Sequence, residues 1–251
     1  MTSCDDLIAE AAAASIQGWD FSWLEGRAVE ERPSWHYSEL VAQRYTRSSR
    51  ALDLQSGGGE LLARLRARPP FLVAVEGYPP NVEVIARQLC RLGAHVVAAD
   101  SDRPSLPFVD GVFELVTSRH PVVTCWSEIA RVLGPGGTYL SQQVGPHSVR
   151  ELSEFMTGPL PAGSARDPDL ARAVAEASGL SVVDLRVERP MTVFYDVGAV
   201  VFLLRLVVWI VPDFTVERYR DRLRAMHALI EREGSFVTYA SRFLIEAIKG
   251  G

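Results

Sequence analysis

One short segment, an apolar run followed by an acid and three glycines, constrains the fold of this chain most. Residues 51–59 read Ala-Leu-Asp-Leu-Gln-Ser-Gly-Gly-Gly, and a helical pattern follows over residues 60–68. A strand, a glycine-rich turn and a helix in this order form a corner where the backbone approaches a ligand closely. The first N–H groups of the helix are free to bind that ligand. The segment therefore predicts a nucleotide-binding α/β fold.

Apolar strand patterns alternate with helical patterns along most of the chain. This alternation predicts a mainly parallel sheet with helices on both faces, right-handed connections and a final antiparallel strand. Asn81 is the expected N-cap of its helix, and Gly93 is expected to end that helix. The expected strands are 51–54, 71–75, 95–99, 112–117, 138–144, 180–188 and 236–248, and the expected helices are 7–16, 38–45, 60–68, 81–92, 126–133, 149–155 and 169–177.

The domain organisation is expected to be simple. The chain has 251 residues, of which 47% are hydrophobic, enough for one large domain with a substantial core. Residues 191–235 break the alternation and predict a helical insertion. We therefore expect a single domain over residues 1–251, made of an N-terminal helical cap (1–46), a nucleotide-binding core (47–190), a helical insertion or lid (191–235) and a last strand (236–251).

Composition and charge exclude several classes of partner. The net charge of −5 gives no general attraction for nucleic acid. The three cysteines are far apart and form no Cys-x-x-Cys pair, so we expect no metal site and a reduced cytoplasmic setting. The N-terminus has acids and no basic segment typical of a signal peptide. The sequence leaves the oligomeric state open.

The most hydrophobic stretch covers residues 197–211. Arg205 interrupts it, and it is shorter than the roughly 20 residues that a membrane span requires. We expect no stable membrane insertion and a buried helix or lid here. A surface that touches a membrane or a greasy substrate is the alternative.

Three further segments accompany residues 53–59 in a fixed order. They are Val73-Ala74-Val75-Glu76-Gly77, then Leu106 to Val116 with Asp110-Gly111 and Phe113-Glu114-Leu115-Val116, and Arg131-Val132-Leu133-Gly134-Pro135-Gly136-Gly137. In this order and spacing, the four segments resemble the class I S-adenosylmethionine-dependent methyltransferases, the seven-stranded Rossmann-like family often called type 11. The resemblance covers roughly residues 50–145. It implies an α/β fold with a seven-stranded, mostly parallel Rossmann-like sheet.

The resemblance implies S-adenosylmethionine as the cofactor. Asp53 and the turn residues would contact its methionine part, Glu76 its ribose hydroxyls, and Asp100 its adenine amino group. Each acid also has a structural alternative: Asp53 as a helix cap, Glu76 as a surface acid and Asp100 as a turn residue. The cofactor-binding residues expected from the resemblance are Asp53, Gln55, Gly57, Gly58, Gly59, Glu76, Gly77, Asp100, Ser101, Ser118 and Arg119.

Gln55 departs from the family pattern, which normally has glycine at this position. A glutamine restricts positive φ and adds a bulky side chain. No polar partner for it is evident in the sequence, so we expect Gln55→Gly to tighten cofactor binding. If the side chain has acquired a role, the same change weakens binding.

The expected activity is methyl transfer to oxygen, nitrogen or carbon of a small-molecule acceptor. The chain mainly has to align donor and acceptor and exclude water. For a hydroxyl acceptor, the candidate acid–base residues are His120, His36 and Tyr37.

Two other functions are compatible with the same strand, glycine-rich turn and helix. One is a repurposed methyltransferase scaffold, a binding or regulatory protein or an enzyme of a different reaction, with weak or no cofactor binding. The other is a nicotinamide-dependent dehydrogenase. The chain lacks the Tyr-x-x-x-Lys pair of such enzymes, because its only lysine is Lys249.

Overall fold

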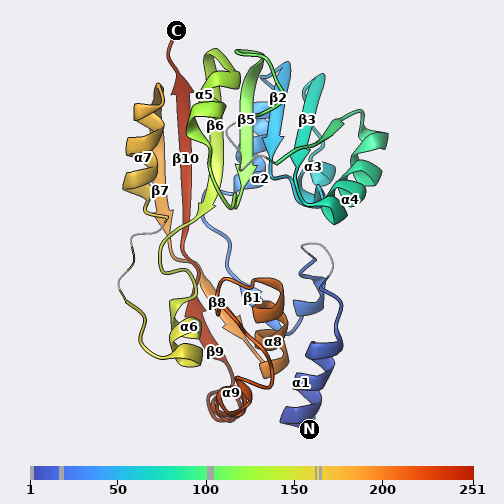
Figure 1. The fold of residues 1–251 in the computed structure, drawn as a ribbon, viewed down its shortest axis with the longest axis vertical. Coiled ribbons are helices and arrows are strands. Elements are labelled where there is room, and N and C mark those ends of the chain that lie inside the picture. Colours follow the sequence, from blue (N-terminus) through green and yellow to red (C-terminus); the bar gives the residue numbers. More distant parts are fainter. Residues whose placement is uncertain (1–2, 17–19, 101–104, 162, 164–165) are drawn as a thin grey trace. The chain divides into compact units, whose positions relative to one another are not determined.

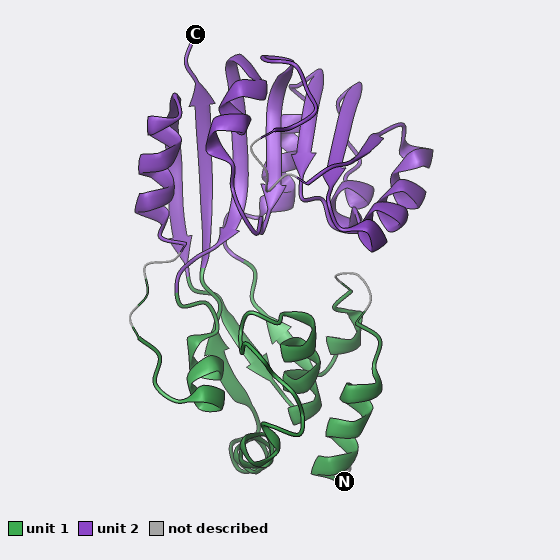
Figure 2. Cartoon of the chain, viewed as in Figure 1, with its two compact units in different colours: residues 1–32, 147–164, 189–241 green, residues 33–146, 165–188, 242–251 purple. Residues whose placement is uncertain are grey.

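The structure is a computed structural model that describes residues 3–16, 20–100, 105–161, 163 and 166–251 (Figure 1). The chain divides into two compact units (Figure 2). Unit 1 comprises residues 1–32, 147–164 and 189–241, and unit 2 comprises residues 33–146, 165–188 and 242–251. The single-domain organisation expected from the sequence stays a prediction.

A seven-stranded sheet forms the centre of unit 2, in the order β4-β3-β2-β5-β6-β10-β7 (Figure 1). The strands from β4 to β6 are mutually parallel, and β10 is antiparallel to both of its neighbours. This confirms the expected α/β fold with a mostly parallel seven-stranded sheet and an antiparallel last strand. The strands are β2 (Arg50–Leu54), β3 (Phe71–Glu76), β4 (His95–Ala98), β5 (Phe113–Arg119), β6 (Leu133–Val144), β7 (Leu180–Glu188) and β10 (Arg242–Lys249).

Helices cover both faces of this sheet. On one face, α2 (Tyr37–Tyr45), α3 (Glu60–Arg64) and α4 (Pro79–Leu89) pack against the strands. On the other face, α5 (Trp126–Val132) and α7 (Pro168–Ala177) do so. Since both faces are covered, the central strands are apolar on both sides, the pattern that parallel sheets require.

Unit 1 is a three-stranded antiparallel sheet with helices. Its strand order is β1-β8-β9, with β1 (Ala28–Glu30), β8 (Met191–Phe194) and β9 (Phe236–Tyr239). Its helices are α1 (Cys4–Ala13), α6 (Arg150–Thr157), α8 (Val197–Leu206) and α9 (Arg220–Glu233). Phe194 and Phe236 pack against these helices in a hydrophobic core of its own. The expectation of one core did not include this second one.

The hydrophobic stretch at residues 197–211 begins as α8, most of whose side chains are buried in the core of unit 1. This agrees with the expected buried helix. Among the helices of the described residues, none has the length and apolarity that a membrane span requires.

Three sequence expectations are corrected here. The insertion over 191–235 is not purely helical, because it begins with β8. The expected last strand over 236–248 is two strands, β9 and β10, in different sheets. Between them, the N–H of Ala240 bonds to the carbonyl of Pro190 and that of Ser241 bonds to Ser148 Oγ, so both residues leave the ladder.

The third correction concerns Asn81. Helix α4 begins at Pro79, and Tyr78 occupies the N-cap position. Proline suits the first turn because its missing N–H has no helical partner there. Asn81 lies one turn before Ile85, and its side chain is buried rather than capping. Gly93 follows the helical segment with φ of 72°, as expected.

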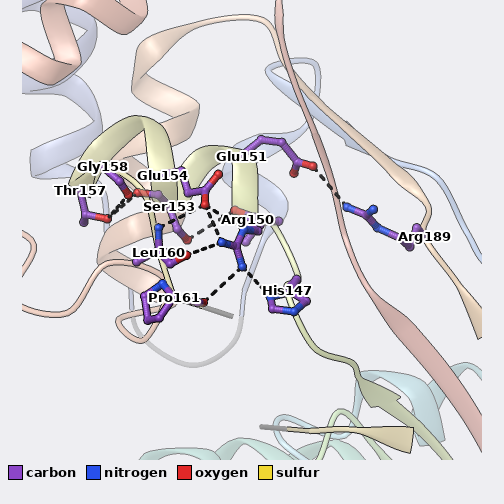
Figure 3. Close-up of polar contacts among 11 residues, drawn as sticks. His147, Arg150, Glu151, Ser153, Glu154, Thr157, Gly158, Leu160, Pro161 and Arg189 are labelled. Carbon is purple, nitrogen blue, oxygen red and sulfur yellow. Dashed lines mark hydrogen bonds and ion pairs between the residues drawn. The ribbon is translucent and has the colours of Figure 1, made fainter. Parts of the chain in front are cut away.

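Arg150 organises the polar segment after α6 in unit 1 (Figure 3). Its guanidinium donates to Glu154 Oε1 at 2.8 Å and to the carbonyls of Leu160 and Pro161. It also donates to Nδ1 of His147 at 2.9 Å. These contacts give His147 a structural role.

Candidate functional site

The candidate site lies at the carboxyl edge of the parallel strands in unit 2. The strand order reverses between β2 and β5, because β3 and β4 lie on one side of β2, and β5 and β6 on the other. Open α/β sheets bind ligands outside the carboxyl ends of strands at such a switch point. The expected residues after β2, β3 and β5 therefore come from neighbouring strands at one edge.

The glycine-rich turn follows β2 and leads into α3. The Ser56 N–H bonds to the carbonyl of Val75, and the Gly57 N–H bonds to Glu76 Oε2 at 2.7 Å. Gly59 has φ of 83° and is the N-cap of α3. A Cβ at Gly59 would lie 2.7 Å from Cγ1 of the fully buried Ile85. Both backbone conformation and space therefore require glycine at this position.

Glu76 is the last residue of β3, and its carboxylate supports the turn from the neighbouring strand. One oxygen accepts the Gly57 N–H at 2.7 Å, and the other accepts the Tyr78 N–H at 2.8 Å. Since a carboxylate offers about four acceptor positions, each oxygen keeps one for a ligand hydroxyl. Glu76 is therefore not the surface acid of the alternative interpretation: its side chain is buried.

Gly77 and Asp100 bring the ends of β3 and β4 together. A Cβ at Gly77 would lie 3.2 Å from both the Ala99 carbonyl oxygen and the Asp100 Cα. Asp100 is exposed and follows β4, where the adenine partner is expected. Ser101, the other residue expected there, lies outside the described residues.

Asp53 is buried, and its side chain is bonded to the neighbouring strand β5. Its Oδ1 accepts from Thr117 Oγ1 at 2.6 Å, and Thr117 in turn accepts from the Tyr45 hydroxyl at 3.3 Å. The pKa of the Asp53 carboxyl is raised to about 6: burial is the largest cause, the hydrogen bonds from Thr117 and Ser56 oppose it, and the Glu76 charge adds a smaller rise. The side chain is thus held by a buried hydroxyl chain, and it is not a helix cap.

The raised pKa of Asp53 predicts a pH-dependent stability. The unfolded carboxyl ionises near pH 4, whereas the folded one ionises near pH 6. Between these values the folded state binds more protons, so the free energy of unfolding falls as pH rises. Asp53→Asn keeps an acceptor for Thr117 and removes the ionisation. We expect its stability relative to the wild type to increase by about 2 kcal/mol from pH 4 to pH 7.

Urea denaturation of both proteins at several pH values measures this difference. Asp169→Asn, at an exposed acid in the first turn of α7, is the matched control. A difference in the free energy of unfolding between Asp53→Asn and the wild type that stays constant across the pH range would contradict the raised pKa of Asp53.

Gln55 is the residue at which the structure changes the interpretation most. Its φ is 53°, the left-handed conformation that the family glycine would adopt freely. Its side chain is directed to the segment after β5: Nε2 donates to the Val123 carbonyl at 2.7 Å, and Oε1 accepts the Val122 N–H at 2.6 Å. These two partners, which are not evident in the sequence, come from the segment after β5.

These two bonds reverse the expected effect of Gln55→Gly. Each lost bond should lower the free energy of unfolding by about 0.5–1.5 kcal/mol, whereas glycine relieves about 1 kcal/mol of strain from the left-handed conformation. We expect Gln55→Gly to weaken cofactor binding several-fold, because the 122–123 segment loses its attachment to the turn.

Gln55→Ala is the matched variant, since it loses the same bonds and keeps the strain. Thermal unfolding should rank it about 1 kcal/mol below Gln55→Gly. Tighter binding of S-adenosylhomocysteine by Gln55→Gly in a calorimetric titration would refute the stabilising role of the Gln55 bonds to residues 122 and 123.

Ser118 and Tyr37 are both engaged inside the fold. The Ser118 hydroxyl lies 2.7 Å from the Tyr139 hydroxyl and 2.9 Å from Ser141 Oγ, and it is buried. The Tyr37 hydroxyl donates to the carbonyls of Ser118 at 2.8 Å and Leu140 at 3.2 Å. Burial, then the nearby Asp53 charge, raises the pKa of Tyr37 well above its ordinary value. This geometry does not favour Tyr37 as a base or the Ser118 side chain as a cofactor contact.

His120 ends a hydrogen-bonded chain that starts at Trp35. The indole N–H donates to Gln142 Oε1 at 2.8 Å, and Gln142 Nε2 lies 2.8 Å from His120 Nε2. Because the Gln142 amide oxygen already accepts from Trp35, its N–H₂ group faces His120 and donates to Nε2 of the imidazole. The imidazole proton is therefore on Nδ1. Burial, then the charges of nearby arginines, lowers the pKa of His120 well below its ordinary value. His120 is therefore neutral near pH 7 and presents an N–H donor.

His36 is exposed at the start of α2, with φ of 47°. No bond in the described part of the chain connects it to His120. In the ranges that the structure describes, no group of three or more His, Cys, Asp or Glu side chains is placed to hold a metal ion.

Three residues that hold the site residues in place were not predicted from the sequence: Trp35, Tyr45 and Thr117. Thr117 had a signal: it is a polar residue inside the apolar run of β5, and it lies opposite Asp53 in the register of the sheet. Trp35 and Tyr45 had none, because their partners are far away in the sequence.

Part of the chain is similar in sequence to known methyltransferases. A family model described as a methyltransferase domain matches residues 52–141. A demethylmenaquinone methyltransferase from Thermus thermophilus is 33% identical over 96 residues, which cover 35% of this chain. The match spans 44% of the length of that relative.

Solved structures share the fold of this chain at low sequence identity. The YcgJ protein of Bacillus subtilis has a TM-score of 0.59 at 16% identity, covering 86% of this chain and 99% of its own. A phosphoethanolamine N-methyltransferase from Haemonchus contortus, in complex with S-adenosyl-L-methionine, has a TM-score of 0.52 at 16% identity, covering 86% and 53%. The [4+2]-cyclase SpnF has a TM-score of 0.54 at 18% identity, covering 97% and 92%. The fold therefore occurs with more than one activity.

Proposed function

We propose that this protein transfers the methyl group of S-adenosylmethionine to a small-molecule acceptor. One observation carries the proposal. In the segment that matches the methyltransferase model, the Glu76 carboxylate lies beside the glycine-rich turn, with acceptor capacity left on both oxygens. This is the arrangement that a ribose with two hydroxyls requires.

The residues of the turn fit this cofactor. A side chain at Gly59 would meet Ile85, and one at Gly77 would meet the end of β4. With glycine at both positions, the backbone packs closely there and carries no side chain that would obstruct a ligand. The Gln55 side chain is directed to residues 122 and 123. We propose that Glu76 holds the ribose, that Gly57 to Gly59 lie against the methionine part, and that Asp100 lies at the adenine.

The cofactor supplies an activated sulfonium methyl group, so the protein mainly has to align the acceptor and exclude water. His120 is neutral, and its Nε2 lone pair accepts from Gln142. It therefore suits a hydrogen-bond donor that orients the acceptor better than it suits a strong base. This favours an acceptor atom that is already nucleophilic.

A small-molecule acceptor fits the net charge of −5, which gives no attraction for nucleic acid. All three cysteines are free, which fits the proposed cytoplasmic setting.

The second candidate is a repurposed scaffold, and the similarity to the cyclase SpnF favours it specifically. An assay of S-adenosylhomocysteine release against a panel of small-molecule amines, phenols and carboxylic acids separates the two. Methyl transfer predicts acceptor-dependent release that Glu76→Gln abolishes. Cofactor binding with no release for any acceptor class would favour the repurposed scaffold.

A further inference from the structure

His120 is held at two points by one residue of the neighbouring strand β6. Its backbone N–H donates to the Gln142 carbonyl at 2.7 Å, and its Nε2 lies 2.8 Å from Gln142 Nε2. His120 follows β5 with a φ of 54°, a left-handed conformation that is uncommon for a residue with a Cβ. Such a conformation persists only where the surrounding contacts fix it, and residues of this kind cluster at functional sites.

Trp35 sets the orientation of the Gln142 side chain. An indole N–H can only donate, so the amide atom 2.8 Å from Trp35 Nε1 is the oxygen. The other end of the amide is then an N–H₂ group, which also can only donate, and it faces a lone pair on His120 Nε2. A neutral histidine in water carries its proton mainly on Nε2, so the form with the proton on Nδ1 needs a partner that enforces it.

The strand register places His120 beside the glycine-rich turn. Ser118 pairs with Leu54 in the parallel ladder of β5 and β2. His120 and Gln55 therefore both lie just beyond the carboxyl ends of these neighbouring strands. Gln55 also bonds to residues 122–123, which begin two positions after His120. The segment that contains His120 is thus attached both to β6 and to the turn after β2.

The chain of hydrogen bonds is enclosed at one end and open at the other. Trp35 and Gln142 are buried, whereas His120 is only partly buried. Within the ranges that the structure describes, no hydrogen bond is made to His120 Nδ1. The result is an N–H donor of fixed orientation, without a protein partner in those ranges, at the edge where ligands of such sheets bind.

We propose that Trp35 and Gln142 are positioning residues for methyl transfer: they hold the His120 imidazole so that its Nδ1 N–H donates to a lone pair of the methyl acceptor. This inference rests on the proposed function and deepens it. The substrate class is a small molecule with an oxygen or nitrogen atom that accepts this bond beside the methylated position. Trp35 and Gln142 act through His120 and not by contact with the acceptor.

Nitrogen-15 NMR of the full chain near pH 7 tests the proposal, because protonated and unprotonated ring nitrogens differ widely in chemical shift. His120→Gln identifies the His120 signals by their loss. We expect His120 in the wild type to carry its proton on Nδ1, whereas the exposed His95 should show the ordinary preference for Nε2. A wild-type His120 with its proton on Nε2 overturns the proposal.

Two variants test whether the buried pair causes this proton placement. Trp35→Phe keeps an aromatic ring and removes the N–H, so the amide can turn its oxygen to the imidazole, and a second His120 form with the proton on Nε2 should appear. Gln142→Glu presents an acceptor to both neighbours and should protonate Nε2 in nearly all molecules. Trp126→Phe is the matched control, since Trp126 is also buried in unit 2 and its indole bonds to no described residue. An unchanged His120 spectrum in either variant, when circular dichroism shows it folded, overturns the proposal.

Titration with S-adenosylhomocysteine separates this proposal from the proposed function. The ligand should shift the His120 signals and leave those of His95 unchanged, because His120 lies beside the turn that would hold the methionine part. If calorimetry shows binding but the His120 signals do not move, the imidazole is not at the methyl position, and this proposal fails while methyl transfer stands. If no binding occurs although the proton is on Nδ1, the proposed methyl transfer is contradicted, and the role of His120 in it falls as well.

Discussion

Gly59→Ala should be among the most destabilising single-methyl changes in unit 2, by about 2–5 kcal/mol. The added Cβ would lie 2.7 Å from Cγ1 of Ile85, which is fully buried in α4. Ile85 cannot move without disturbing the core that it shares with α3. Overpacking of this kind costs about 1–3 kcal/mol, and the left-handed conformation adds about 1–2 kcal/mol.

Gly93→Ala is the matched control for this prediction. Gly93 also has a positive φ, 72°, but apart from its chain neighbours no atom of the described residues lies within 4 Å of the position of its Cβ. Chemical denaturation should show only the conformational cost of about 1–2 kcal/mol for Gly93→Ala. Equal losses in the two variants would mean that the contact between the turn and α4 is not as tight as described.

Glu76→Gln should weaken binding of S-adenosylhomocysteine about a hundredfold or more. The carboxylate is expected to accept both ribose hydroxyls, and charge-assisted hydrogen bonds contribute about 1.5–3 kcal/mol each. It also accepts the N–H groups of Gly57 and Tyr78, so an amide at this position would turn its N–H₂ toward a backbone donor. The change therefore disturbs both the ligand contact and the turn.

Two comparisons separate these effects of Glu76. Glu83→Gln changes an exposed acid in α4 and should leave binding unchanged. Methylthioadenosine and its 2′-deoxy form should differ in affinity for the wild type and be nearly equal for Glu76→Gln. If the affinity difference between methylthioadenosine and its 2′-deoxy form is the same in both proteins, Glu76 supports the turn without contacting the ribose.

The central sheet could be predicted because parallel strands buried on both faces appear as short apolar runs, such as Ala51 to Leu54 and Phe71 to Val75. The sheet of unit 1 could not. Its strands have three or four residues, too few to show a two-residue period. The apparent single strand over 236–248 breaks only because Ala240 and Ser241 bond outside the ladder. That break depends on contacts with residues distant in the sequence.

The candidate site was predictable in its local parts. The turn glycines and Glu76 follow their strands directly, so strand assignment alone places them at one edge. The partners of Gln55, Asp53 and His120 come from other strands, and their contacts depend on register and on positive φ values. A sequence pattern shows neither property, which is why the bonds of Gln55 to residues 122 and 123 and the buried role of Asp53 emerged only from the structure.

Calorimetric titration of S-adenosylhomocysteine into the wild-type protein and Glu76→Gln tests the central claim most directly. The account predicts saturable one-to-one binding by the wild type and a loss of about a hundredfold or more in the variant, with both proteins folded by circular dichroism. Absence of measurable heat with the wild type at millimolar ligand, or equal affinity in the two proteins, would contradict it.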